Sequence, residues 1–197
     1  TLDIIHQLGT MLERTPGINV IYTRKEDVFI PLWKRTQIAN SKNGDLFISL
    51  HVNASSHKSA KGYETYLLRV GKADAAIEVA KRENAVIAME QKEHNYKKFD
   101  NEEMIVATMT QNADLKSSEL FASLTQKHLS KNINSINRGV KQAGFHVLVG
   151  ASMPNVLIEV GFLSNPEEAK KLKKAQYRRQ IAKGIYQAIL EYKKKYE

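Results

Sequence analysis

Two residues with catalytic potential lie at apolar segments that are typical of β-strands. His51 follows the apolar run 46–50, and Glu159 interrupts the apolar run 156–160. Burying a carboxylate in such a strand is costly unless it is paired, hydrogen-bonded, protonated or close to a metal. A structural ion pair would explain Glu159, and so would a general base facing the same cleft as His51. For His51, a structural role is the alternative to a chemical one.

Strand geometry predicts where these two side chains point. With a period of two residues, His51 shares a face with Ser49 and Asn53, opposite Ile48 and Leu50. Open α/β sheets place ligands at the carboxyl ends of their strands, where His51 lies. Because His51 and Glu159 are far apart in the sequence, only the tertiary fold can bring them together.

The pattern along the chain predicts an α/β fold with a mixed, mainly parallel sheet flanked by helices. Helical spacing of apolar residues is found near 2–12, at 32–40 and in the segment 166–197, and the predicted strands are 18–22, 46–50, 63–68, 145–149 and 155–160. The segment from about 73 to 132 has helical periodicity and almost no strand pattern. We therefore expect a single domain over 1–197 that contains a helical insertion at about 73–132.

Composition narrows the class of protein. The chain has 197 residues, of which 42% are apolar and 26% charged, and this excludes collagen-like, coiled-coil and wholly disordered chains. No stretch approaches the roughly 20 apolar residues of a membrane span. Because the chain has no cysteine, a metal site must be built from His, Asp or Glu.

The formal net charge of +9 is concentrated at the carboxyl end, where 166–197 holds ten Lys or Arg residues against four Asp or Glu. A solvated helix face explains this excess, and attraction to a nucleic acid or an anionic cell-wall polymer is the alternative. We expect no nucleic-acid partner, because no RNP-like pattern, zinc finger or P-loop accompanies the charge and such a partner gives no reason for Glu159.

Five segments have a distinctive combination of residues. They are 20–24 (VIYTR), 35–40 (RTQIAN), 45–54 (DLFISLHVNA), 137–145 (NRGVKQAGF) and 153–166 (MPNVLIEVGFLSNP). Through them the chain resembles the zinc-dependent N-acetylmuramoyl-L-alanine amidases of the Amidase_3 type, which are bacterial peptidoglycan hydrolases. The resemblance covers both ends of the chain in the family's order and is weak in the helical middle.

The resemblance implies a zinc site that this sequence contains in part. The family holds zinc with a His in a glycine-rich loop, a Glu shortly after it, and the His of an H-x-N segment, which is His51 here. The other two ligands are expected upstream of Thr1, and the helical pattern that is already running at residue 2 also suggests an upstream segment.

The resemblance also implies a reaction. Glu159 matches the catalytic Glu of the family. Zinc with three protein ligands keeps one position for water and can lower the pKa of that water to about 7. As general base, Glu159 would take the proton of the water and pass it to the departing amine. The bond cut joins N-acetylmuramic acid to L-alanine of the stem peptide, in the periplasm or the extracellular cell wall; the alternative is an inactive peptidoglycan-binding or regulatory module.

The resemblance also suggests how the site is regulated, and several polar residues are candidates for substrate contacts. The insertion resembles a region that, in cell-division members of the family, supplies a helix blocking the site until a protein activator displaces it; Glu83 or Glu90 would then be an inhibitory zinc ligand rather than a solvated helix residue. Asn53 would orient substrate or cap a loop, and Arg138 would meet substrate carboxylates or form an ion pair. Arg24 and Arg35 are expected to hold loops together.

Overall fold

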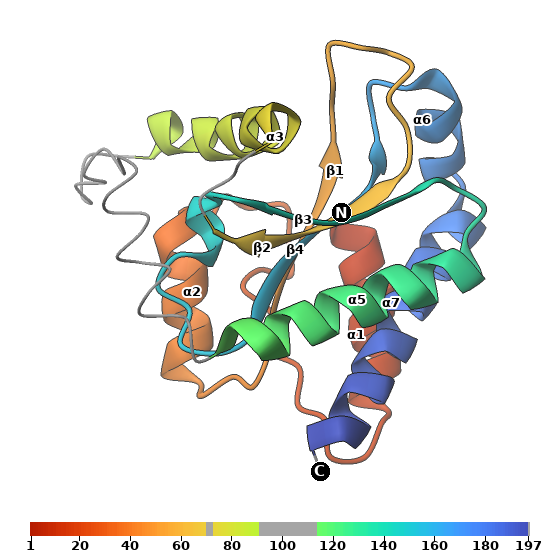
Figure 1. The fold of residues 1–197 in the computed structure, drawn as a ribbon. Helices are drawn as coiled ribbons and strands as arrows, with labels where there is room; N and C mark the ends of the chain where they lie inside the picture. The colour runs from red at the N-terminus through yellow and green to blue at the C-terminus, as the bar shows by residue number, and fades with distance from the viewer. Residues whose placement is uncertain (70–72, 91–113, 197) are drawn as a thin grey trace.

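A computed structural model of the chain describes residues 1–69, 73–90 and 114–196. This part of the chain forms a four-stranded sheet with helices on both faces (Figure 1). The elements are α1 (Leu2–Glu13), α2 (Leu32–Ser41), β1 (Phe47–Asn53), β2 (Tyr63–Leu68), α3 (Asp74–Asn84), the 3-10 helix η1 (Ala85–Met89), α5 (Leu115–Asn132), β3 (Asn137–Ala143), the 3-10 helix η3 (His146–Leu148), β4 (Asn155–Phe162), α6 (Pro166–Leu172) and α7 (Ala175–Tyr196).

The strands follow the order β1-β4-β2-β3 across the sheet. β1 pairs with β4 and β2 pairs with β3 in parallel, whereas β2 and β4 are antiparallel. The predicted α/β class with a mixed, mainly parallel sheet flanked by helices is therefore confirmed.

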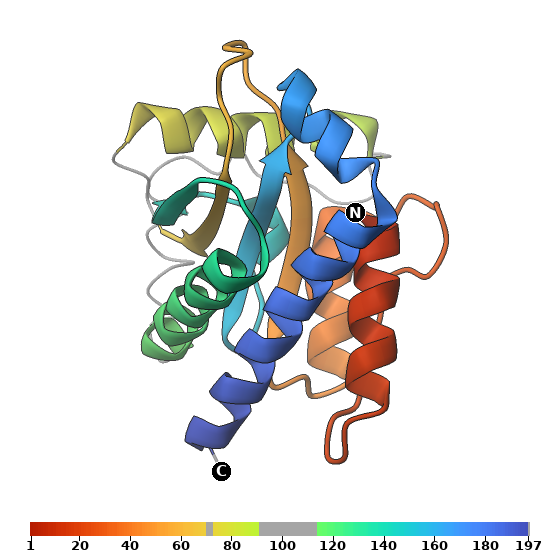
Figure 2. The same ribbon diagram turned by 90° about the vertical axis from the view of Figure 1, so that its right-hand side faces the viewer.

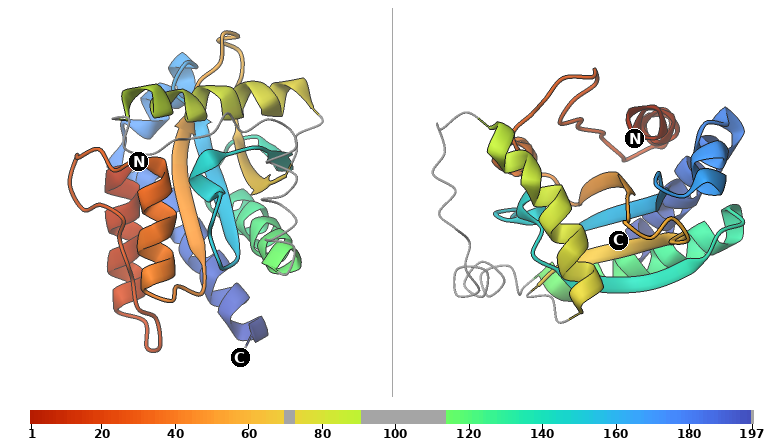
Figure 3. Two further views of the ribbon diagram at one scale, coloured as in Figure 1. Left: turned by 90° about the vertical axis from the view of Figure 1, so that its left-hand side faces the viewer. Right: turned by 90° about the horizontal axis from the view of Figure 1, so that it is seen from above.

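The two faces of the sheet bury separate hydrophobic cores. One core packs against α1, α5 and α7, and Figure 2 shows α1 and α7 running side by side over this face. In α7 the buried residues Ile181, Ile185, Ala188 and Tyr192 recur at helical spacing, as predicted. The other core packs against α2, α3 and η3, and Figure 3 shows α3 crossing in front of the ends of β1 and β4.

Two of the predicted strands are wrong. No strand forms at 18–22, and this segment has no place in the four-stranded ladder of the described residues. At 145–149 the chain forms η3 instead of a strand. This segment is apolar because Phe145, Val147 and Leu148 are all buried in the compact turn. The strand that follows α5 is β3, which the pattern hid because it is an edge strand rich in polar side chains.

The described parts of the predicted insertion are helical: they comprise α3, η1 and α5. Residues 91–113, in the middle of the insertion, lie outside the described residues. Among the helices that are described, none combines the length and apolar character that crossing a membrane demands.

A cavity of about 1330 Å³ lies between α1, α2 and the outer edge of β1. Its lining includes the apolar side chains of Leu8, Val20 and Ile48, and it extends to His51 and Glu83. Among the described strands, β1 has a neighbour only on its β4 side. An unpaired strand edge thus borders an apolar cavity, a combination that natural proteins usually cover.

A buried carboxylate joins three loops at the end of the sheet where β4 ends. The side chain of Asn165 caps α6 by accepting from the backbone N–H groups of Glu167 and Glu168. Glu168, only 3% exposed, then accepts from the backbone N–H groups of Gly62 (2.9 Å) and Phe162 (2.8 Å). The Ser135 hydroxyl donates to the same carboxylate over 2.6 Å.

We predict that Glu168→Ala lowers the free energy of unfolding by about 3 kcal/mol, because it leaves buried backbone donors without an acceptor. Urea denaturation at neutral pH measures this change. Glu167→Ala is the matched control, since that neighbouring side chain is 77% exposed and, among the described residues, forms an ion pair with Lys61 alone, at 3.9 Å. A surface pair of this kind contributes at most about 1 kcal/mol. Equal effects of the two substitutions would contradict the role given to Glu168.

Candidate functional site

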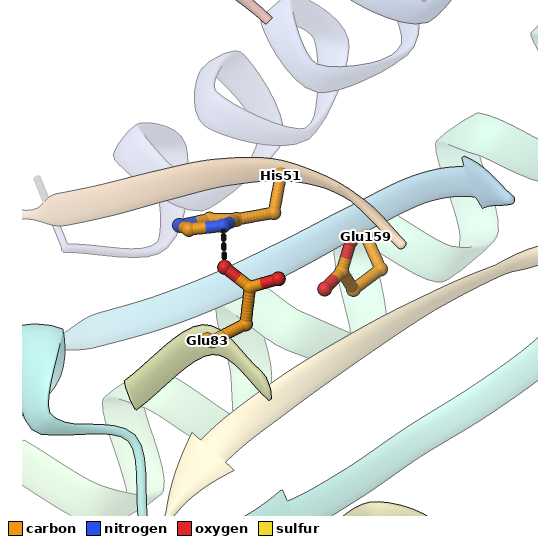
Figure 4. A group of neighbouring side chains, drawn as sticks. All are labelled: His51, Glu83 and Glu159. Carbon is orange, nitrogen blue, oxygen red and sulfur yellow. Dashed lines mark ion pairs between the residues drawn. The ribbon is translucent and has the colours of Figure 1, made fainter. Parts of the chain in front are cut away.

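Three ionisable side chains from neighbouring strands form a row on the face of the sheet that α3 covers. His51 of β1 is in register with Glu159 of β4, and Glu159 is in register with Glu64 of β2. On β1 and β4 the same face carries Phe47 and Leu157, which belong to the core against α2 and α3. Thus the fold brings together His51 and Glu159, the two residues singled out in the sequence (Figure 4).

α3 supplies a fourth group to this row. Glu83 forms an ion pair with Nδ1 of His51 through Oε2, while Nε2 of His51 and the Ser49 hydroxyl share a hydrogen bond of 2.9 Å. Figure 4 shows the Glu83 carboxylate directed at the His51 ring, with Glu159 beside it. Both nitrogens of the imidazole are therefore engaged, and the ring orientation is fixed from two sides.

Glu159 has an environment that opposes ionisation. Its side chain is 0% exposed, and neither carboxylate oxygen has a hydrogen-bond partner among the described residues. Burial raises the pKa of Glu159 well above its usual value, the nearby carboxylates of Glu83 and Glu64 raise it further, and Arg82 opposes them. A buried carboxylate with two unsatisfied oxygens is ready to accept a proton or a cation.

The donor set suits a divalent metal. One ligand atom from each of His51, Glu83 and Glu159 lies within 4.8 Å of the others. Imidazole nitrogen and carboxylate oxygen are ligands that zinc accepts, and a cation there would satisfy the unpartnered oxygens of Glu159. The residues present therefore fit a metal of this type.

Glu64 and Glu159 are both buried, but their pKa values are shifted in opposite directions. Oε1 of Glu64 accepts from the Asn53 amide (2.9 Å) and the Tyr66 hydroxyl (2.7 Å), and Oε2 accepts from Arg138 (2.9 Å) and Lys141 (2.5 Å). Burial alone raises the pKa of Glu64, but hydrogen bonds from Lys141, Tyr66 and Arg138 outweigh it and hold that pKa below its usual value. Glu64 is therefore an ionised anchor.

The remaining sequence candidates have identifiable contacts. Asn53 caps the following loop, since its Oδ1 accepts from the Ala54 backbone N–H (2.8 Å), and it also accepts from Arg82 of α3 (3.1 Å). Arg24 and Arg35 hold a loop, as expected, by donating to the backbone carbonyls of Val28 and Ile30.

Of the two glutamates considered as inhibitory ligands, Glu83 reaches His51 and Glu90 does not. Glu90 accepts from the backbone N–H of Leu32 (2.8 Å) at the start of α2. Sequence reasoning missed Glu64, although the same signal that marked Glu159 was available: a carboxylate inside the apolar segment 63–68.

Comparison with known proteins places this geometry in a family context. The family model Amidase_3, described as N-acetylmuramoyl-L-alanine amidase, matches residues 1–191. The chain is 33% identical over 200 residues to the amidase AmiC of Neisseria meningitidis, with 97% of this chain and 46% of that protein covered. It is 31% identical over 194 residues to AmiC of Escherichia coli, with 97% and 46% covered.

A solved structure shares the fold. The amidase from Clostridium difficile 630 matches with a TM-score of 0.71 and 26% identity, covering 98% of this chain and 81% of that one. The chain spans about half the length of the two curated AmiC proteins.

We predict opposite effects on stability for the isosteric variants Glu159→Gln and Glu64→Gln in metal-free buffer at pH 8. Because the pKa of Glu159 is raised in the folded state, its ionisation destabilises the fold at high pH, so Glu159→Gln should stabilise by about 1 kcal/mol or more. This gain should vanish as the pH falls to the unfolded value near 4.5. Glu64→Gln should destabilise at pH 8, because the pKa of Glu64 is lowered in the folded state.

Urea denaturation across pH 4 to 8 measures both changes, with EDTA present to remove metal. If both substitutions changed stability in the same direction at pH 8, the assignment of a raised pKa to Glu159 and a lowered pKa to Glu64 would be wrong.

Proposed function

The chain belongs to the Amidase_3 family of N-acetylmuramoyl-L-alanine amidases, and from that premise we propose that it hydrolyses the amide between N-acetylmuramic acid and L-alanine in peptidoglycan. The observation that supports this proposal most is the register pairing of His51 with Glu159, whose buried oxygens lack partners among the described residues. An imidazole ligand beside a carboxylate of raised pKa is the arrangement that metal-assisted hydrolysis needs.

Zinc is the proposed cofactor, and His51 is the proposed ligand from β1. When bound, zinc would act as a Lewis acid and lower the pKa of a coordinated water to about 7. The proposal is supported by the donors of His51, Glu83 and Glu159, which lie within 4.8 Å of one another. In it Glu83 is the inhibitory ligand and Glu159 is the base beside the cation. The Ser49 hydroxyl would hold the ring of His51 in place from its other side.

Glu159 is the proposed general base. Its raised pKa suits it to take a proton from the attacking water and return it to the amine of L-alanine as the C–N bond breaks. Glu64, kept ionised by its four donors, would not exchange protons in this step.

The cavity beside β1 supports the proposal that an upstream segment completes the domain. An added strand would pair with the free edge of β1 and cover Leu8, Val20 and Ile48 with apolar side chains. A loop after that strand would lie next to His51, because the cavity reaches this residue. We therefore place the remaining zinc ligands on such a segment.

α3 is the proposed inhibitory element of the insertion. It lies across the site, Glu83 forms an ion pair with His51, and Arg82 donates to Asn53. Substrate access therefore requires α3 to move. A protein activator that binds the insertion would supply the free energy for this movement. The proposed place of action is the cell wall, outside the cytoplasmic membrane, where the substrate lies.

We predict that Glu159→Gln abolishes cleavage of purified peptidoglycan, with a loss of at least about a hundredfold, because general base catalysis contributes roughly that much or more. The assay measures released stem peptide by mass spectrometry, using the chain extended by its natural upstream sequence. Addition of a zinc chelator should stop release, and added zinc should restore it. Equal release by the variant and the parent would refute the mechanism, and binding of peptidoglycan without release by the parent would favour the inactive wall-binding module.

We predict that Glu83→Ala raises basal cleavage about fivefold or more, because it removes a charge-assisted contact that holds α3 over His51. Initial rates without any activator measure the effect. Glu78→Ala is the matched control: Glu78 lies on the same helix, is exposed and, within the described part of the chain, forms an ion pair with Lys81 alone. An unchanged or lower rate in the Glu83 variant would exclude the inhibitory role.

A further inference from the structure

The row of ionisable side chains continues beyond Glu64 to the edge strand β3. The register of β2 and β3 shifts beside Glu64, so that two residues of β3, Arg138 and Gly139, lie opposite one residue of β2. Gly139 has a φ of +80°, as the bulge requires. The bulge directs Arg138 to the face that carries Glu64, and Lys141, which is paired with Tyr66, joins it there.

This end of the row carries surplus positive charge. Arg138 and Lys141 both donate to Oε2 of Glu64, and Oε1 is already occupied by two neutral donors, Asn53 and Tyr66. One carboxylate therefore faces two cations. The pair of cations therefore leaves a net positive charge at this end of the row, which would attract a further anion.

Arg138 is both fixed in position and accessible. Its guanidinium lies 5.1 Å from the centre of the Phe162 ring, and its Nη1 donates to the carbonyl of Lys61 at 3.4 Å. Among the described residues no acceptor lies within hydrogen-bond distance of its Nη2. The side chains of Arg138 and Lys141 are 32% and 25% exposed. A planar guanidinium held in this way is preorganised to bind a carboxylate.

The distance from the reaction centre gives the position of that carboxylate in a substrate. β3 lies two strands beyond β4, which carries Glu159. At about 4.8 Å per strand, the separation is roughly 10 Å. An extended peptide covers about 3.3–3.6 Å per residue, so an anion at β3 lies two or three residues from a bond cleaved at Glu159.

We propose that Arg138 and Lys141 form a subsite for a free carboxylate of the stem peptide, located two or three residues beyond the scissile amide. The subsite selects peptides that keep this carboxylate over those in which it is amidated. The inference rests on the proposed amidase function, because it assumes that the cleaved bond lies at Glu159. Glu64 is the positioning residue that holds both cations in place.

The test compares two fluorescent N-acetylmuramoyl peptides that differ only in whether the second residue after the scissile bond carries a carboxylate or a carboxamide. Binding is measured by anisotropy in the Glu83→Ala, Glu159→Gln chain, which lacks the ion pair that holds α3 over His51 and does not consume the peptide under the proposed mechanism. We expect about a tenfold lower Kd for the carboxylate. Adding Arg138→Gln should remove this preference, and Arg138→Lys should keep part of it.

Arg179→Gln is the control, because Arg179 is exposed on α7, away from the row, and should keep the full preference. Thermal melts of every variant verify folding, and Lys141→Gln provides a second substitution that leaves Glu64 paired with Arg138. Equal binding of the two peptides, no binding of either, or a preference that survives both Arg138→Gln and Lys141→Gln would overturn the subsite. This experiment measures binding and not cleavage. A negative result would therefore exclude the subsite without deciding the amidase proposal, which the peptidoglycan cleavage assay tests.

Discussion

The parallel pairing of β1 with β4 is the constraint on which the site depends. It sets His51 beside Glu159 at the level of the backbone, so no flexible loop has to bring the two side chains together. The same pairing buries Glu159 completely between flanking strands and leaves both of its oxygens without partners among the described residues. The fold thus buries a carboxylate at an energetic cost and sets an imidazole directly beside it, and the proposed hydrolysis depends on this pair.

Two carboxylates on one face acquire different properties because their neighbours differ. Glu159 faces other carboxylates and apolar strands, which raise its pKa, whereas Glu64 collects four donors that keep it charged. Environments that separate the pKa values of neighbouring acids are typical of sites that move protons. In this molecule the division follows the order of strands, from a carboxylate of raised pKa on β4 to two cationic side chains on the edge strand β3.

Sequence patterns predicted the architecture, because strand periodicity and helical spacing are local properties. The meeting of His51 with Glu159 was predicted through the family resemblance, because no local pattern relates two residues so far apart in the sequence. They did not predict β3, whose polar side chains lack the alternation of a half-buried strand. Glu64 itself could have been noticed as a carboxylate in an apolar segment, but its ionised state could not have been predicted, because its cationic partners Arg138 and Lys141 lie on that hidden strand. Which of Glu83 and Glu90 reaches His51 depends on how α3 and η1 pack against β1 and α2. The spacing of apolar residues within one helix does not predict that packing.

The Glu168 carboxylate has an evolutionary consequence. Its three donors come from the segments around Gly62, Ser135 and Phe162, which are remote from one another in the sequence. Replacing Glu168 by a residue without a side-chain acceptor leaves all three donors unpaired at once. Drift at this position therefore has to pass through intermediates of low stability, and insertions in any of the three segments must preserve the distance to one shared oxygen pair.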